Sequence, residues 1–320
     1  MIRRGYLGIS LVVSVLALLP DFVASNTVLN FVVFSIIIAL AAQGWNLLGG
    51  MGGQFSFGHA AFFGTAAYVS AMLQVSAGVN AWIATGCGIA AGVGVGWIIG
   101  FLSFRAGLRG SYFALVTLAF AEVLRIVANA SAFTSGAAGL LLELDTGLGN
   151  MQFDSRAAYL WLTLGFLAVA LVAVQWITNS RFGAQVVAVR ENEDAAMALG
   201  VDVLAVKLRT ITVSGAITAT AGCPYLQYFL YIDANIAYGV WISVEALLAA
   251  MVGGRGMVQG AVIDAFTLHG LGELSKEFAG SVPGIDVAAY GLVLILVVAF
   301  APGGIMGIWQ QVRRRFGGKS

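Results

Sequence analysis

Long apolar runs constrain the fold of this sequence more than any other feature. A transmembrane helix needs about 20 predominantly apolar residues to cross about 30 Å of hydrocarbon. Runs that fit this requirement occur at residues 6–24, 28–48, 57–77, 81–104, 111–130, 157–178, 210–231, 239–253, 257–272 and 287–308. Only 10% of the 320 residues are charged, and 60% are hydrophobic. Because a typical soluble domain has about 25% charged residues, a surface with so few charges must largely face lipid.

These runs predict an all-α integral membrane protein of about ten transmembrane helices, within a range of eight to ten. The runs at 239–253 and 257–272 are short and closely joined, so we expect one or two broken or re-entrant helices. Arg3 and Arg4 before the first run would also fit a signal peptide. That run is longer than the apolar core of about 7–15 residues that a signal peptide has. We therefore interpret it as an uncleaved first helix.

Lys and Arg are unevenly distributed between the two sets of connections that ten helices create. Loops on the cytoplasmic side of a membrane carry an excess of these residues. One set holds 13 of the 16, namely Arg3, Arg4, Arg105, Arg109, Arg181, Arg190, Lys207, Arg209, Arg255, Arg313, Arg314, Arg315 and Lys319. The other set holds Arg156 and Lys276, with Arg125 at a helix end, and the acids Asp21, Glu143, Asp145, Asp154, Asp233, Glu273, Glu277 and Asp286. We predict that both termini are cytoplasmic.

Two connections are longer than the others. Residues 131–156 are predicted to form an acidic external loop rich in Gly and Ser, and residues 179–209 a cytoplasmic segment. We expect no separate soluble domain, so residues 1–320 are predicted to form a single transmembrane domain.

The residues that could carry chemistry favour transport over catalysis. His59 and His269 lie on different predicted helices, and Cys87 and Cys223 lie inside apolar runs without the spacing of a metal site. The net charge of +1 does not favour a nucleic-acid partner. We expect a solute-translocating protein that is not an enzyme and binds no metal or cofactor itself. An ion-coupled secondary transporter or channel is the main alternative, and a membrane enzyme is the other.

Polar residues inside the predicted helices are candidates for a translocation pathway, because an ionisable group in lipid is costly and usually faces a cavity or a partner. The glycine-rich stretch 49–54 is a further candidate, because so many glycines cannot hold a regular helix cheaply and broken helices mark substrate sites in many transporters. The predicted pathway residues are Gln43, Asn46, Gly52, Gly53, Gln54, Ser56, His59, Glu122, Glu245 and Asp264.

Each of these candidates also has a structural interpretation. Arg125 follows Glu122 by three residues and lies on the same helix face, so the two could form a structural ion pair. Glu245 and Asp264 could serve only as hydrogen-bonding groups, and the glycine stretch could be a tight turn. The residues alone leave these alternatives open.

Residues 189–200 of the cytoplasmic segment form a short amphipathic stretch that is too polar to span a membrane. It ends in Gly200, a residue suited to a helix C-terminus. Charged residues stand beside small ones at 195, 196 and 198, so a short helix here could dock onto a cytoplasmic partner. The alternative is a solvated connector.

This stretch resembles the coupling motif of ABC importer permeases, in which an acid is followed by two alanines, three further residues and a glycine. Asp194, Ala195, Ala196 and Gly200 fit that motif, with Asp in place of the usual Glu and without the Leu-Pro that often follows. Residues 54–62, 110–122, 190–192 and 300–307 resemble the branched-chain amino acid permease family of LivM type. The similarity covers nearly the whole chain.

The resemblance implies one subunit of an assembled pump in the bacterial inner membrane. A second permease of LivH type, two ATPase subunits and a periplasmic binding protein would be its partners, with ATP and Mg²⁺ bound by the ATPases. The residues implied in coupling to the ATPases are Arg190, Glu191, Glu193, Asp194, Ala195, Ala196 and Gly200. Branched-chain or related amino acids are the implied solute, and urea or an aromatic or dicarboxylic acid is the alternative within the same permease type.

The sequence departs from the family pattern at three positions. Ser135 stands between Thr134 and Gly136 where a second Gly is usual, Met257 stands where Thr is common, and Asp264 stands where Gly is usual. Asp264 lies near the expected pathway, so this departure bears on which solute is carried.

Overall fold

The structure is a computed structural model that describes residues 2–22, 25–252, 254, 256–279, 288, 291 and 292. Nearly all of the tenth predicted run, 287–308, lies outside these residues, and so does the family motif at 300–307. Arg255 and the predicted cytoplasmic C-terminus also lie outside them.

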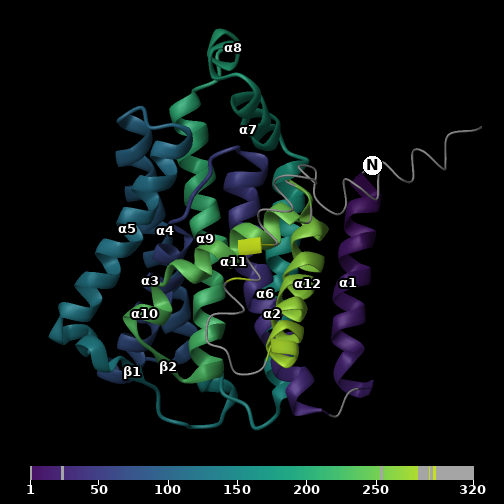
Figure 1. Cartoon of the computed structure of the whole chain (residues 1–320), viewed down its shortest axis with the longest axis vertical. Coiled ribbons are helices and arrows are strands. Elements are labelled where there is room, and N and C mark those ends of the chain that lie inside the picture. The colour runs from purple at the N-terminus through teal and green to yellow at the C-terminus, as the bar shows by residue number, and fades with distance from the viewer. Residues whose placement is uncertain are drawn as a thin grey trace, which may run out of the picture.

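The described part of the chain is built mainly from helices (Figure 1). The longer elements are α1 (Ile2–Phe22), α2 (Asn26–Trp45) with its π-helical extension η1 (Asn46–Met51), α3 (His59–Ala77), α4 (Ala81–Arg105), α5 (Gly110–Ala130), α6 (Arg156–Thr178), α7 (Arg181–Glu191), α9 (Val203–Phe229), α11 (Val240–Val252) and α12 (Val258–Ala279). The shorter ones are η2 (Ala132–Thr134), η3 (Gly136–Ala138), β1 (Leu140–Leu141), η4 (Leu148–Asn150), α8 (Glu193–Ala198), β2 (Tyr231–Ile232) and α10 (Ala234–Ala237). The two strands pair antiparallel and join the 131–156 loop to the end of α9.

Eight helical segments in the described residues are long and apolar enough to cross a membrane. They are Gly5–Phe22, Asn26–Met51, His59–Ala77, Ala81–Arg105, Gly110–Ala130, Arg156–Thr178, Val203–Phe229 and Ala234–Val252. They correspond in order to the first eight predicted runs. The all-α membrane-protein prediction is therefore confirmed at this level, while the count of ten stays a prediction.

The boundaries around the last predicted helices need correction. The seventh run was predicted to begin at 210, but α9 begins at Val203, so Lys207 and Arg209 lie inside a helix and not in a connection. The eighth segment is interrupted at Tyr238–Gly239, between α10 and α11. Helix α11 has 13 residues, which at 1.5 Å per residue is about 20 Å, less than the hydrocarbon thickness.

The ninth predicted run forms α12, a helix of 22 residues. This helix is absent from the eight segments found in the described part of the chain. Its sequence includes four charged residues, Asp264, Glu273, Lys276 and Glu277.

Close packing of α3, α4 and α9 is made possible by glycines at four-residue spacing on α4. Gly88, Gly92, Gly96 and Gly100 all lie on the side of α4 that meets the other two helices. A Cβ atom added at Gly88 would lie 2.4 Å from the backbone oxygen of Ala66 on α3. Because apolar side chains gain little by leaving lipid for protein, membrane helices associate through such close backbone approach.

The glycine-rich stretch 49–54 contains the end of the helix, as the sequence predicts, but its first three residues still belong to a π-helix. Helix α2 continues without a break into η1, which ends at Met51, and non-helical backbone follows up to His59. A Cβ added at Gly49 would lie 2.5 Å from the Trp45 ring, and one at Gly50 would lie 2.7 Å from the backbone nitrogen of Gly256. These glycines therefore serve packing within the wider π-helical turn, and the break falls at Gly52.

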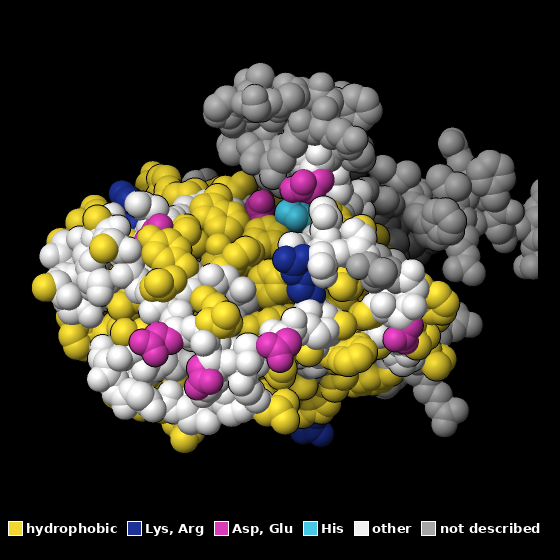
Figure 2. Space-filling view, turned by 90° about the horizontal axis from the view of Figure 1, so that it is seen from below, with side chains coloured by type: hydrophobic (Ala, Val, Ile, Leu, Met, Phe, Trp, Pro, Cys, Tyr) yellow, Lys and Arg dark blue, Asp and Glu magenta, His cyan; other side chains and the backbone are white. Residues whose placement is uncertain are grey.

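The two long connections lie at opposite ends of the helices. Helices α7 and α8 lie at the top of Figure 1, at the same end as the start of α1, and the 131–156 loop lies at the bottom. Figure 2 shows the bottom face, where Asp and Glu side chains are spread among hydrophobic ones, together with a few Lys and Arg side chains. This arrangement agrees with the predicted separation of basic and acidic connections.

Reporter fusions test the predicted orientation. A reporter inserted within 131–156 is expected to report the periplasmic side, and reporters placed in 199–202 and after Ser320 the cytoplasmic side, because cytoplasmic loops retain Lys and Arg. Compartment-specific activity, such as that of alkaline phosphatase, is the measurement. If the reporter after Ser320 gives the same side as the one in 131–156, the chain has an odd number of spans and the ten-helix topology is wrong.

Candidate functional site

Helices α7 and α8 form a segment that projects beyond the ends of the longer helices (Figure 1). The sequence predicts one short helix near residues 189–200, but the structure divides the region at Asn192. Its side chain accepts a hydrogen bond from the backbone nitrogen of Ala195 at 3.0 Å and so caps α8. Asn, like Asp and Ser, is favoured at this position because its oxygen satisfies an unpaired N–H of the first turn. Gly200 has φ +83°, which ends the segment as predicted.

The outer surface of α8 is partly apolar. Met197 is 50% exposed and Leu199, which follows the helix, is 85% exposed. Asp194 and Ala195 are also exposed, whereas Ala196 is 2% exposed. Of the two predicted contact alanines, therefore, only Ala195 lies on the outer surface, because the helical turn directs Ala196 into its own chain.

The α7–α8 segment is anchored to the glycine-rich stretch below it. Nη1 of Arg190 donates a hydrogen bond to the backbone oxygen of Gly50 at 3.3 Å. A Cβ atom added at Gly53, which has φ +68°, would lie 2.5 Å from Cγ of Arg190. Arg190 also pairs with its neighbour Glu191 at 2.5 Å. Residues that the sequence assigned separately to coupling and to the pathway are thus in contact.

Two of the predicted pathway residues hold the start of α12. Nε2 of Gln43 donates to the backbone oxygen of Val258 at 2.6 Å. Asn46 donates to the backbone oxygen of Met257 at 3.1 Å and accepts from the nitrogen of Gly256 at 2.8 Å. Both side chains are buried, so in this structure they act as internal anchors of the 256–258 segment.

His59 and Ser56 are also buried in contacts between helices. Nε2 of His59 lies 3.0 Å from Oγ of Ser214, which donates to the backbone oxygen of Gly44 at 2.7 Å. The backbone oxygen of Ser56 accepts from the indole of Trp45 at 2.8 Å. Buried polar groups are costly unless they are hydrogen-bonded, and these contacts connect α2, α3 and α9.

Asp264 on α12 and Glu245 on α11, the two acidic candidates, lie in different surroundings. Asp264 is 1% exposed, and its Oδ2 has no hydrogen-bond partner among the described residues. Glu245 lines a small pocket with Ile38 and His269, between α2, α11 and α12. Gln54 is half-buried at the beginning of the non-helical stretch.

Glu122 and Arg125 form the ion pair that their three-residue spacing makes possible. Nε of Arg125 lies 2.9 Å from Oε2 of Glu122, and Nη2 lies 2.5 Å from Oε1. Nη1 of Arg125 donates to Oδ1 of Asn235 on α10 at 2.6 Å, a contact that sequence reasoning missed. The side chains of Glu122 and Arg125 are 40% and 30% exposed, although both lie inside a segment apolar enough to span a membrane.

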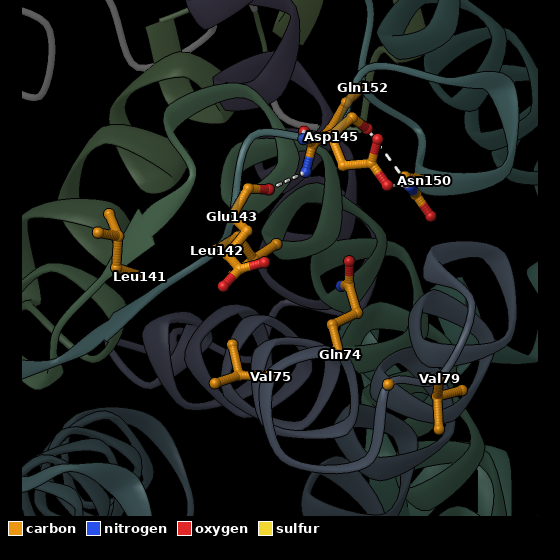
Figure 3. Close-up of a pocket in the computed structure, with 10 residues that line it drawn as sticks. Gln74, Val75, Val79, Leu141, Leu142, Glu143, Asp145, Asn150 and Gln152 are labelled. Carbon is orange, nitrogen blue, oxygen red and sulfur yellow. Dashed lines mark hydrogen bonds between the residues drawn. The ribbon is translucent and has the colours of Figure 1, made fainter.

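A pocket of 330 Å³ lies between the end of α3 and the 131–156 loop. Its polar lining includes Gln74, Glu143, Asp145 and Gln152 (Figure 3). The loop is held in shape by Gln152, which donates to the backbone oxygen of Glu143 at 3.0 Å. The sequence predicts an acidic loop here, but the pocket needs α3, which is distant in sequence.

Known proteins that are similar to this chain are transport permeases. The profile of a family described as the permease component of the branched-chain amino acid transport system matches residues 27–298. A probable branched-chain amino acid transport permease protein LivM of Methanocaldococcus jannaschii is 22% identical over 225 residues, which are 66% of this chain and 65% of that protein. The high-affinity LivM permease protein of Escherichia coli K12 is 24% identical over 316 residues, 91% of this chain and 73% of that protein.

A second type of permease is also similar. The high-affinity LivH permease protein of Escherichia coli K12 is 30% identical over 158 residues, which are 49% of each chain. No solved structure matches.

Proposed function

The chain belongs to the family of branched-chain amino acid transport permeases and is of LivM type, and from this premise we propose that it is the permease subunit of a binding-protein-dependent ABC importer. The proposed solute is a branched-chain or related amino acid, moved across the inner membrane. The chain is a multi-pass membrane protein, and eight segments of its described residues are suited to spanning. Urea or an aromatic or dicarboxylic acid is the alternative solute, and solute binding by the cognate periplasmic protein distinguishes them.

The exposed apolar surface of α8 is the observation that carries this proposal. Met197 on α8 and Leu199 just after it are exposed. Helix α8 lies at one end of the molecule, opposite the 131–156 loop (Figure 1). Exposed apolar patches rimmed by polar residues are typical of contact sites with another protein or a membrane. In an ABC importer the partner at this place is an ATPase subunit, so we assign α8 as the element that docks onto it.

The remaining partners follow from the same family membership. LivM and LivH relatives both resemble this chain, which supports pairing with a second, homologous permease. ATP and Mg²⁺ would be bound by the two ATPase subunits. The binding protein would approach the opposite face, where the 131–156 loop lies.

Glu122, Arg125 and Asn235 are the residues we propose for the translocation pathway or its border with the second permease. A charged group facing lipid costs about 2.5–3.5 kcal/mol at a helix centre on insertion scales. A half-exposed ion pair inside a spanning helix is therefore expected to face water or another subunit. Gln43, Asn46, Ser56 and His59 are buried within the chain and hold the helices together in this structure, and they stay pathway candidates.

The proposed mechanism is alternating access. ATP binding would stabilise the conformation in which the two ATPases are closed, and α8 would be displaced with them. A ligand shifts such an equilibrium only by its difference in affinity for the two conformations. ATP hydrolysis then removes that difference and returns the permease pair to the inward-facing conformation.

A Leu199→Asp substitution tests the docking of α8. The variant is expected to insert normally but to lose ATPase subunits and transport. Burying a Leu side chain contributes about 1.5–3 kcal/mol, and its loss weakens association by about tenfold or more. The measurement is the ATPase content of complexes purified through this chain, together with uptake of labelled leucine in vesicles.

Leu144→Asp is the matched control, because Leu144 is 71% exposed in the 131–156 loop. This control is expected to keep its ATPase subunits. Ala196→Trp is a poor probe, since Ala196 is buried and a Trp there would disturb the chain itself. If the Leu199→Asp complex keeps its full ATPase content, α8 is only a connector and not a docking element. Transport that is driven by an ion gradient without ATPases would favour a secondary transporter.

A further inference from the structure

One carboxylate, that of Glu193 at the start of α8, joins two of the long helices. Its Oε2 lies 3.0 Å from Nη2 of Arg109, the residue immediately before α5. Its Oε1 accepts a hydrogen bond from Nζ of Lys207, in the second turn of α9. A single side chain therefore connects the proposed docking element with the beginnings of α5 and α9.

The contact with Lys207 is buried and not a surface ion pair. The side chains of Glu193 and Lys207 are 16% and 7% exposed. The Lys207 ammonium also lies 5.6 Å from the centre of the Phe104 ring at the end of α4. A buried ammonium needs an opposite charge nearby, and removing that charge is strongly unfavourable. The position of Glu193 relative to α9 is therefore held firmly.

The other charged contact of the segment is weaker. Arg190 pairs with its neighbour Glu191, whose side chain is 67% exposed, and such exposed pairs contribute little. Arg190 also donates a hydrogen bond to the backbone oxygen of Gly50, at 3.3 Å, but this contact is not an ion pair. Among the described contacts of α7 and α8, the Glu193–Lys207 pair is thus the buried ionic connection to a long helix, whereas the Arg109 side chain that also meets Glu193 is 63% exposed.

We propose that Glu193 is the positioning residue through which a displacement of α8 is passed to α5 and α9. The proposal rests on the proposed function, because it takes α8 as the element that moves with an ATPase. Helix α5 carries the Glu122–Arg125 pair, and α9 packs closely against α3 and α4. Movement of Glu193 would draw the buried Lys207 and the start of α9 with it, and the start of α5 would follow through the more exposed pair with Arg109.

A Glu193→Gln substitution in the complete complex separates this role from docking. The complex of both permeases and both ATPases, with the binding protein, is reconstituted in vesicles with labelled leucine as the probe. The variant is expected to keep its ATPase subunits and to hydrolyse ATP. The amount of leucine transported per ATP is expected to fall by about tenfold, within the range that mutations along a coupling network produce.

A second variant guards against a simple loss of folding. Glu193→Gln with Lys207→Gln leaves no buried ammonium without a partner, so the fold is expected to recover. If Glu193 transmits movement, leucine transported per ATP stays low in this double variant, while Glu193→Asp, which keeps the charge, recovers part of it. Arg209→Gln is the control, since Arg209 is exposed on the same helix and forms no ion pair among the described residues.

The outcomes distinguish the two proposals. If the unmodified chain does not co-purify with ATPases, the proposed function fails and this inference fails with it. If the ATPases are present but Glu193→Gln transports as much leucine per ATP as the parent, only the transmission role is wrong. A double variant that restores the full ratio would show that the Glu193–Lys207 pair is structural and would overturn the proposal.

Discussion

A Gly88→Leu variant is expected to yield little folded protein, whereas Gly86→Leu, on the same helix, is expected to behave like the parent chain. A Cβ atom at Gly88 would lie 2.4 Å from the backbone oxygen of Ala66, so α3 and α4 would have to separate. At Gly86 the added Cβ meets no atom of the described residues within 4 Å outside its own stretch of helix. Overpacking costs about 1–3 kcal/mol when side chains can adjust, and backbone cannot adjust as readily.

The pair of variants isolates packing from helix propensity. Leu replaces Gly in both, so each gains the same intrinsic preference of up to about 1 kcal/mol for the helix. The measurement is the yield of monodisperse protein in detergent and its thermal stability. Equal yield and stability of the two variants would contradict the close approach of α3 and α4.

A Glu122→Gln variant is expected to lose most of its transport activity and part of its folded yield. The substitution removes the carboxylate charge paired with Arg125 and leaves it neutral acceptors, the introduced amide oxygen and Asn235, inside a segment suited to spanning a membrane. An Arg at a helix centre costs about 2.5–3.5 kcal/mol on insertion scales. Because Arg125 lies towards the end of α5 and not at its centre, we expect a cost below that range.

The double variant Glu122→Gln/Arg125→Gln measures the interaction. Its loss of stability is expected to be smaller than the sum of the two single losses, by about 0.5–3 kcal/mol for residues in contact. Transport by the double variant is expected to stay low if the pair borders the pathway, even where the fold recovers. Asp154→Asn, which removes an exposed acid outside the helices, is the control. Strictly additive losses of stability would show that the two residues do not interact.

The sequence by itself determined the membrane class, the first eight helical segments and the ends at which basic and acidic connections gather. It also determined that an ion pair between Glu122 and Arg125 was possible. These properties depend on local patterns: about 20 apolar residues form a spanning helix whatever surrounds them, and residues three apart share a helix face. Family resemblance came from motifs of the same local kind.

Only the tertiary structure decided which candidate residues meet one another. Asn46 contacts Gly256 and Met257, more than 200 residues away, and is an internal anchor there. Ala196 is buried while Ala195 is exposed, because the turn of α8 places them on different faces of the helix. Glu193 reaches both Arg109 and Lys207, which the chain brings together only after α4, α5 and α9 have packed. Such contacts depend on distances between segments far apart in the chain, and a local pattern carries no information about those distances.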